Sequence, residues 1–152
     1  MQQESGRSLI EVLGVLAVAG VMTAGAIGMY SMIRRTHTRS VAITQLEQIA
    51  KNTKILLETR NDYRGVSVEY LIKAGALDSD QSPIGGARWS VASGVDGDYF
   101  SINLTDVSES DCVYFSEKLF DWADDILVNG YSVGEIDSCF KSDTNQISFI
   151  VR

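Results

Sequence analysis

Glu11 is the residue that most clearly suggests chemistry, because it lies at the edge of a long uncharged run. The run extends from Val12 to Ile33 and contains 22 residues. A helix rises about 1.5 Å per residue and the hydrocarbon core of a bilayer is roughly 30 Å thick, so the run is long enough to span a membrane. A carboxylate in lipid is costly and usually has a partner. Two interpretations stay open: an acid resting among lipid headgroups, and an acid with a function.

The cysteines are the second feature with evident chemistry. Cys112 and Cys139 are too far apart for a Cys-x-x-Cys redox pair and show no metal-ligand spacing. An even number of cysteines in an exported domain favours a disulfide. Two free buried thiols are the alternative.

The residues needed for most enzyme chemistry are absent from the sequence. The only histidine is His37, next to the uncharged run, so no Ser-His-Asp or Cys-His arrangement exists in the C-terminal part. No glycine-rich phosphate-binding loop is present. Asp96 and Asp98, with Asp106, offer oxygen ligands for Ca²⁺, although acidic residues are also common in hairpin turns. We expect no catalytic residue, no metal and no cofactor.

The elements that position these residues begin with one long helix, predicted from Ser8 to Arg60. Its first half is rich in small residues, which let helices approach closely in lipid. Its second half is amphipathic, and the helical spacing of its apolar residues predicts a face that packs under a sheet. The apolar residues are Val41, Ala42, Leu46, Ile49, Ala50, Ile55, Leu56 and Leu57.

The remaining chain predicts a mixed domain of helices and antiparallel strands. A short helix is expected at 66–74, with Gly75 as its stop signal. Strands are expected at 88–92, 99–104 and 147–151, and Gly94 to Asp98 predicts a hairpin turn. A helix is expected to begin at 108–111, with its apolar face continuing to Leu127. Asn129-Gly130 predicts a turn.

Charge divides the chain into two parts. Residues 1–60 hold seven Lys/Arg and four Asp/Glu, a net of +3, whereas residues 61–152 hold six and sixteen, a net of −10. An acidic domain argues against a nucleic-acid surface, which needs clustered basic residues. Arg34, Arg35 and Arg39 follow the uncharged run, and the positive-inside rule alone would place the C-terminal domain in the cytoplasm.

The N-terminal segment resembles a known leader sequence. The string Gly6-Arg7-Ser8-Leu9-Ile10-Glu11-Val12-Leu13 resembles the class III leader of type IV pilins and related pseudopilins. The family usually has Phe or Met where this chain has Arg7, and its leader usually carries positive charge where this one carries Glu4. The resemblance, with the cysteine pair, implies an exported domain in spite of the basic residues after the run.

The resemblance implies a processing step and a role for Glu11. A prepilin peptidase would cut between Gly6 and Arg7 and methylate the new terminus, so that Glu11 becomes the fifth mature residue. The new amine and a carboxylate are each costly in low dielectric, and pairing them offsets much of that cost. In the family, Glu11 of one subunit would meet the amine of its neighbour and set the register of packing helices.

The C-terminal half is similar to the type IVb major pilins in particular. The order of features is Gly85-Gly86 before a strand, a long helix starting at Cys112, then Val128-Asn129-Gly130, Cys139 and a final strand at 145–149. The resemblance implies a disulfide between Cys112 and Cys139 that bounds a loop beside the sheet.

Together these features predict an α+β pilin subunit without enzymatic activity. The expected parts are a leader at 1–6, a transmembrane assembly stem at 7–33, the amphipathic half of the stem at 34–60 and a globular head at 61–152. Its expected partners are copies of itself in a helical homopolymer, the prepilin peptidase, an inner-membrane assembly platform and the membrane, without nucleic acid. The precursor would lie in a bacterial inner membrane with a periplasmic head, and the mature subunit in an extracellular pilus.

Two other functions fit the same sequence. A pseudopilin of a secretion system shares the stem but forms a short periplasmic piston. A singly anchored periplasmic binding domain would keep residues 1–6 and stay monomeric.

Overall fold

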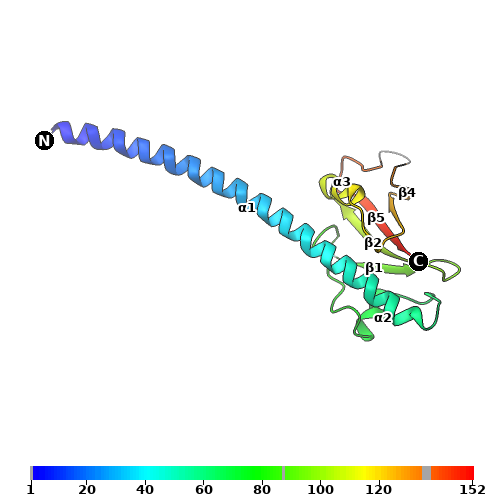
Figure 1. Ribbon diagram of the computed structural model, residues 1–152. Helices are drawn as coiled ribbons and strands as arrows, with labels where there is room; N and C mark the ends of the chain where they lie inside the picture. Colours follow the sequence, from blue (N-terminus) through cyan, green and yellow to red (C-terminus); the bar gives the residue numbers. More distant parts are fainter. Residues whose placement is uncertain (1, 87, 135–137) are drawn as a thin grey trace. The chain divides into compact units, whose positions relative to one another are not determined.

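The computed structural model describes residues 2–86, 88–134 and 138–152, and for residues 2–7 it describes only the helical backbone. The chain divides into two compact units, Met1–His37 and Thr38–Arg152. Helix α1, Gln2–Glu58, runs through both units (Figure 1). The predicted long helix is therefore confirmed, although it begins before Ser8 and ends two residues before Arg60.

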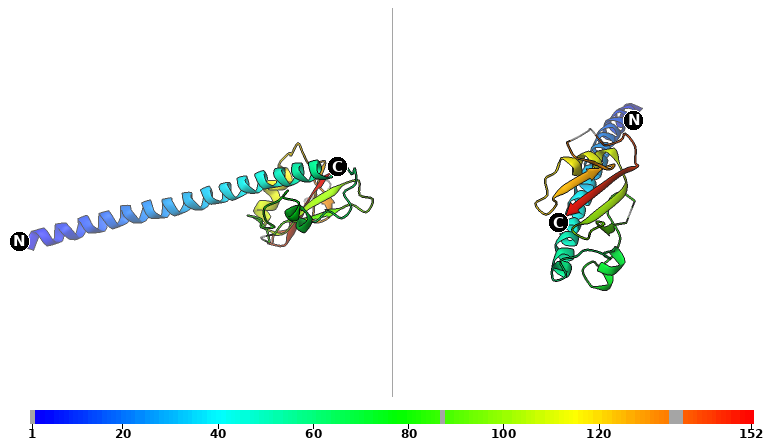
Figure 2. Two further views of the ribbon diagram at one scale, coloured as in Figure 1. Left: turned by 90° about the horizontal axis from the view of Figure 1, so that it is seen from below. Right: turned by 90° about the vertical axis from the view of Figure 1, so that its right-hand side faces the viewer.

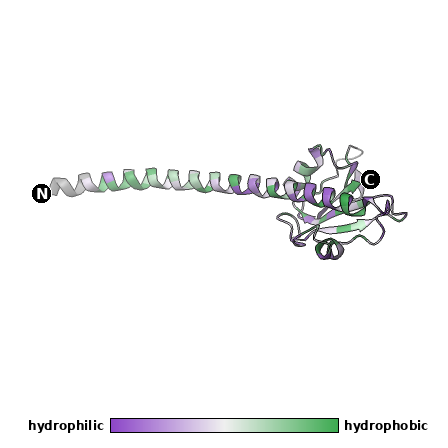
Figure 3. Cartoon of the chain, turned by 60° about the horizontal axis from the view of Figure 1, so that its bottom comes forward, coloured by the Kyte–Doolittle hydropathy of each residue, from purple (hydrophilic) through white to green (hydrophobic). Residues whose placement is uncertain are grey.

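The first unit is a helix whose side chains are exposed along its described length. Every residue from Ser8 to His37 is exposed. Figure 3 shows that hydrophobic residues dominate this part of α1. An 18-residue window of the helix has a mean hydropathy of 2.1 and none of it is buried, so by length and composition α1 is able to cross a membrane.

The second unit contains an antiparallel sheet of five strands in the order β1-β2-β5-β3-β4. The C-terminal strand β5 lies at the centre, between β2 and β3, and pairs with both (Figure 2). The strands are β1 (Ser90–Ser93), β2 (Phe100–Val107), β3 (Asp125–Val128), β4 (Tyr131–Ser132) and β5 (Asn145–Val151). The predicted α+β class, a long helix packed on an antiparallel sheet, is confirmed.

The core of this unit forms where the second half of α1 meets the sheet. Leu46, Ile49 and Leu57 of α1 are at most 1% exposed and belong to the same cluster as Ile102 and Phe149 of the sheet. The amphipathic spacing explains this placement, because residues three and four apart share one face of a helix. The prediction that this stripe packs under the sheet is confirmed for Ala42, Leu46, Ile49, Ala50 and Leu57 and is wrong for Ile55, which is 70% exposed.

Glycine and asparagine close the turns that the sequence predicted. Helix α2, Val68–Lys73, is capped by Ser67 and is followed by Gly75 at a φ of +75°. Asn129 and Gly130, at φ values of +50° and +89°, connect β3 to β4. Both positions need the left-handed region, which glycine adopts freely and asparagine tolerates.

Helix α3, Glu109–Glu117, is shorter than the sequence predicted. It begins as expected, with the Ser108 side chain accepting a hydrogen bond from the Asp111 N–H. The prediction that its apolar face continues to Leu127 is wrong, because the backbone is extended at Lys118 and Leu127 lies in β3. The part of the type IVb resemblance that rested on a long helix after Cys112 is therefore wrong as well.

Pairing with β5 explains why this segment is a strand. Residues Asp125 to Val128 pair with Ile150 to Ile147, and their backbone hydrogen bonds replace those of a helix. The preceding aromatic residues leave the helical path to pack on the sheet: the rings of Phe120 and Trp122 lie 5.5 and 5.6 Å from the ring of Phe149.

Candidate functional site

Glu11 is the only charged residue between Ser8 and Ile33, and its side chain is exposed. The large apolar side chains of this segment are between 51% and 75% exposed. Exposed apolar surface on this scale needs a cover of lipid or protein. The structure thus places the predicted assembly acid on a helix surface that the chain itself leaves uncovered.

Two hydroxyl groups of the stem, those of Thr23 and Ser31, are satisfied within the helix. Thr23 Oγ1 donates to the carbonyl oxygen of Ala19 at 2.7 Å, and Ser31 Oγ donates to that of Gly28 at 2.9 Å. Hydroxyls satisfied in this way are tolerated in lipid. Glu11 differs, since its carboxylate has no hydrogen bond or ion pair with any side chain that the structure describes.

The predicted cleavage site lies inside α1. The backbone at Gly6 and Arg7 is helical, and the side chain of Arg7 falls outside the described part of the chain. The cut between these residues, and the pairing of the new amine with Glu11, stay predictions.

The stem glycines have open space around them. A Cβ atom added at Gly14, Gly20, Gly25 or Gly28 would meet no atom within 4 Å. Packing within one copy of the chain therefore does not require glycine at these positions. If these glycines serve close contacts between helices, the second helix must belong to another molecule.

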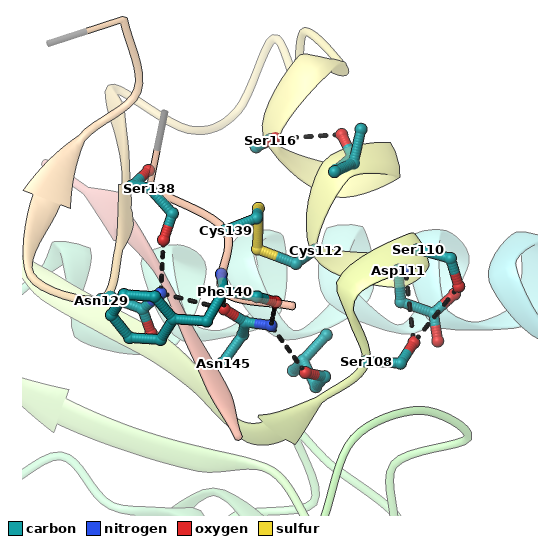
Figure 4. Close-up of a disulfide and its surroundings, with 12 residues drawn as sticks. Ser108, Ser110, Asp111, Cys112, Ser116, Asn129, Ser138, Cys139, Phe140 and Asn145 are labelled. Atoms are coloured by element: carbon teal, nitrogen blue, oxygen red, sulfur yellow. Dashed lines mark hydrogen bonds between the residues drawn. A yellow bond between two sulfur atoms is a disulfide. The ribbon is translucent and has the colours of Figure 1, made fainter. Parts of the chain in front are cut away.

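The two cysteines form the predicted disulfide, which links α3 to the segment before β5 (Figure 4). Cys112 and Cys139 are 27 residues apart in the sequence. Closing a loop of this length contributes roughly 3–4 kcal/mol in the chain-entropy model.

Asn145 holds the loop beside the disulfide in place and is fully buried. Its side-chain Nδ2 donates to the carbonyl oxygens of Val107, Phe140 and Ser142 at 3.0 to 3.2 Å. Its Oδ1 accepts from the Phe140 N–H at 2.7 Å and from Asn129 Nδ2 at 3.0 Å. This side chain satisfies backbone groups that would otherwise be buried without partners. Sequence reasoning missed its role.

A second missed contact joins α1 to α3 within the globular unit. Arg39 Nε donates to Asp111 Oδ1 at 2.8 Å, and its guanidinium carbon lies 4.5 Å from the ring centre of Tyr114. The two charged side chains are only 18% and 20% exposed. A charge-assisted hydrogen bond and a cation–π contact thus fix α3 against α1. Arg39 is therefore part of the head's packing as well as of the basic segment.

The loop after α1 contains three groups with shifted pKa values. Hydrogen bonds from Arg64 hold the pKa of Asp62 below its ordinary value of 3.8, and the same contact raises the pKa of Arg64. Burial raises the pKa of Tyr63 above its usual value of 10.0, and the carboxylates of Glu58 and Asp124 raise it further. The Tyr63 ring lies 4.9 Å from that of Phe100.

The acidic turn does not supply a metal site within the described residues. Asp96, Gly97 and Asp98 lie between β1 and β2, where the Gly97 carbonyl accepts a hydrogen bond from the Tyr63 N–H at 2.9 Å. Across the described ranges, no three His, Cys, Asp or Glu side chains group closely enough to hold a metal ion.

A polar hollow of about 300 Å³ lies beside the second half of α1. Three amide side chains of the helix line it, together with the loop after α2 and Trp89; the amides are Gln45, Gln48 and Asn52. Trp89 Nε1 donates to Gln45 Oε1 at 3.3 Å and Asn52 Nδ2 to the Ala76 carbonyl at 2.9 Å. These groups hold the loop to the helix, which is a sufficient structural reason for their polarity.

Comparison with known proteins gives a structural likeness without a sequence match. No protein-family model matches the chain, and no curated protein matches it in sequence. Among solved structures it is similar to the crystal structure of TcpA, a type IV pilin from Vibrio cholerae El Tor biotype, with a TM-score of 0.62 and 10% sequence identity. The match covers 76% of this chain and 99% of the other. The chain therefore has the fold of a type IV pilin.

Proposed function

We propose that this chain is the structural subunit of a type IV pilus, made as a membrane-anchored precursor and polymerised through its N-terminal helix. The observation that carries the proposal is Glu11, the single carboxylate on an apolar stretch of α1 that is exposed from Ser8 to His37. Such a helix is stable in lipid, and it is equally stable when copies of itself cover it. The pilin fold of the chain supports the same interpretation.

The proposed maturation gives Glu11 its partner. A prepilin peptidase cuts after Gly6 and methylates the amine of Arg7, which creates a cation at the start of the stem. Glu11 of one copy then pairs with this amine on a neighbouring copy. Either charge alone is costly in an apolar bundle, so only a register that pairs them is favourable.

The head forms the outer part of the subunit. It works by assembly, without catalytic turnover. Its disulfide suits a domain that works outside the cytoplasm. The order of glycines, cysteines and C-terminal strand resembles that of type IVb pilins and supports a subunit of that subclass. We propose residues 7–33 as the assembly stem, 34–60 as its amphipathic half and 61–152 as the head. The partners are further copies, the peptidase and an inner-membrane assembly platform, and the filament is extracellular.

The N-terminus of the mature chain tests the proposal most directly. Mass spectrometry of protein purified from membranes is expected to find a chain that begins at methylated Arg7. A chain that still begins at Met1 and stays monomeric in detergent would instead indicate a singly anchored binding domain. A cut chain found only in short periplasmic assemblies, without surface fibres, would indicate a pseudopilin.

Glu11→Ala tests the electrostatic step. The variant is expected to enter the membrane and to be cut normally, but to form few or no filaments, because the amine of the neighbour loses its partner. Filaments are counted by electron microscopy of sheared material. Glu58→Ala is the matched control, since it removes an exposed carboxylate at the other end of the same helix. Normal filaments from Glu11→Ala would refute the pairing.

A further inference from the structure

Two partly apolar surfaces flank the second half of α1. The first, here called the Leu119 surface, is a groove of about 350 Å³ whose apolar lining is Ile43, Leu119, Phe120 and Trp122. The second, here called the Ala74 hollow, is a depression of about 250 Å³ lined by Asn52, Ile55, Leu56, Ala74, Gly75 and Ala76. Both lie within the globular unit.

The two surfaces lie on different sides of the helix. Ile43, Glu47 and Lys51 contribute to the Leu119 surface, whereas Asn52, Ile55 and Leu56 contribute to the Ala74 hollow. At about 100° of rotation per residue, the centres of the two sets lie roughly 130° apart around the axis of α1. A third side of α1 faces the sheet. The surfaces are therefore free to contact two different neighbours at once.

Leu119 is the most distinctive residue on the first surface. It follows α3 and is 94% exposed, whereas the adjacent Phe120 turns inward to pack on Phe149. The Ala74 hollow is complementary in chemistry, since Ala74, Gly75 and Ala76 are among its lining residues and Ile55, which also lines it, is 70% exposed. A leucine that entered this hollow would bury apolar area on both partners.

Charges beside the two surfaces are complementary. Lys118 and Asp121 lie on either side of Leu119 in the sequence, and Lys73 and Asp78 lie on either side of the small residues of the hollow. Among the described residues, neither Asp121 nor Lys73 has an ion-pair partner. When one surface meets the other, Lys118 can face Asp78 while Asp121 faces Lys73. Such pairs select one orientation and add little affinity by themselves.

We propose that the occupant of the Ala74 hollow is Leu119 of a second copy of this chain. The contact is heterologous, because it joins two different surfaces. Since these surfaces lie on different sides of α1, each copy is able both to give and to receive a leucine, and the contact repeats without closing. The inference rests on the proposed filament function and identifies the head surfaces that its subunits use.

Photo-crosslinking of the full-length chain in assembled filaments tests the contact. The crosslinking amino acid p-benzoylphenylalanine replaces Leu119, and irradiated filaments are analysed by gel electrophoresis and peptide mass spectrometry. We expect a crosslinked dimer whose partner peptide contains Lys73 to Asp78. The matched control places the same amino acid at Val95, which is also 94% exposed but lies in the β1–β2 turn.

Charged substitutions give an independent readout. Leu119→Asp is expected to lower filament yield at least about tenfold relative to Val95→Asp, because a buried carboxylate replaces an apolar contact. Asp121→Lys alone and Lys73→Asp alone are each expected to lower the filament yield. The double variant, in which the two charges are exchanged, is expected to restore it.

The outcomes separate this inference from the function on which it rests. Filaments that carry p-benzoylphenylalanine at position 119 and crosslink to another segment, or equal yields of Leu119→Asp and Val95→Asp, would overturn the proposed contact and leave the pilin function standing. A wild-type chain that forms no filaments would overturn both.

Discussion

At the scale of single residues, Glu11 and Asn145 are both polar groups in apolar surroundings. They differ in their partners within the described chain. Asn145 is fully buried, and its amide is satisfied by groups of the same chain. Glu11 is exposed on the stem and has no described side chain as a partner. A polar group that a chain satisfies internally serves its own fold, whereas an acid left on an apolar helix needs a second molecule.

The first residue-scale prediction concerns Asn145→Ala. The substitution leaves the carbonyls of Val107 and Phe140 and the side chain of Asn129 without their partner, so we expect a loss of about 2–4 kcal/mol in unfolding free energy. Chemical denaturation of the full-length chain in detergent measures it. Asn103→Ala is the control, because that amide donates only to Ser101 Oγ and should cost less than about 1 kcal/mol. Equal losses would show that Asn145 has no special role.

A second residue-scale prediction concerns Thr53, which is fully buried in α1 and whose hydroxyl has no hydrogen-bond partner in the described structure. Thr53→Val replaces the hydroxyl by a methyl group of similar size. We expect a gain of about 1 kcal/mol, because an unpaired buried hydroxyl is costly. Thr44→Val is the control, as that side chain is exposed and bonded to the Ser40 carbonyl. A loss of stability in Thr53→Val would reveal a partner that the structure does not show.

At the scale of elements, the loop before β1 is held closely against β2 where that strand is irregular. The register of β2 on β5 shifts between Leu104 and Val107, and Asp106 there has a φ of +51°. The Gly86 N–H donates to the carbonyl oxygen of Thr105 at 2.7 Å. The Gly85-Gly86 pair, noted in the sequence before a predicted strand, thus makes the contact between a loop and a bulged strand.

The prediction at this scale compares two glycines. Gly85 and Gly75 have similar φ values, +69° and +75°, but a Cβ at Gly85 would lie 2.6 Å from the Thr105 carbonyl oxygen, whereas one at Gly75 meets nothing within 4 Å. Gly75→Ala should therefore cost only the backbone strain, about 1–2 kcal/mol. Gly85→Ala should cost about 1–3 kcal/mol more, because the loop must move away from β2. Thermal unfolding distinguishes them, and equal costs would exclude the close contact.

At the scale of the whole molecule, the chain combines an apolar stem with an acidic head. The head carries most of the acidic residues, and a net charge far from zero favours solubility. Its pH limits depend on groups whose pKa differs between the folded and unfolded states. Tyr63 is such a group, because it is partly buried and desolvation raises its pKa above 10.0.

The whole-molecule prediction follows from the sign of that shift. A group whose folded pKa is raised stabilises the fold below its ordinary pKa, and this stability is lost as the pH rises through the folded value. Tyr63→Phe keeps the ring beside Phe100 and removes the ionisation, so it should move the alkaline unfolding midpoint to higher pH. Circular dichroism measures the shift between about pH 9 and pH 12, a range from about one unit below the ordinary tyrosine pKa to about two units above it. Tyr131→Phe, at an exposed position, is the control and should leave the midpoint unchanged.

The sequence by itself determined the features that depend on local spacing. The apolar run and its single acid, the amphipathic half of α1, the glycine and asparagine turns and the alternating strands β2 and β5 all follow from patterns within a few residues. These patterns are reliable because each reflects a local cause: membrane thickness, helical periodicity or the left-handed backbone at a turn. The pairing of Cys112 with Cys139, expected from the resemblance, is also present.

Only the tertiary structure decided the contacts between distant segments. Asn145 meets Val107 across 38 residues, and Arg39 meets Asp111 across 72. The segment 125–128 has apolar spacing that suits a helix, but pairing with β5 makes it a strand. No local pattern encodes such partners, because the free energy that selects them comes from backbone hydrogen bonds and burial shared between segments that are remote in sequence.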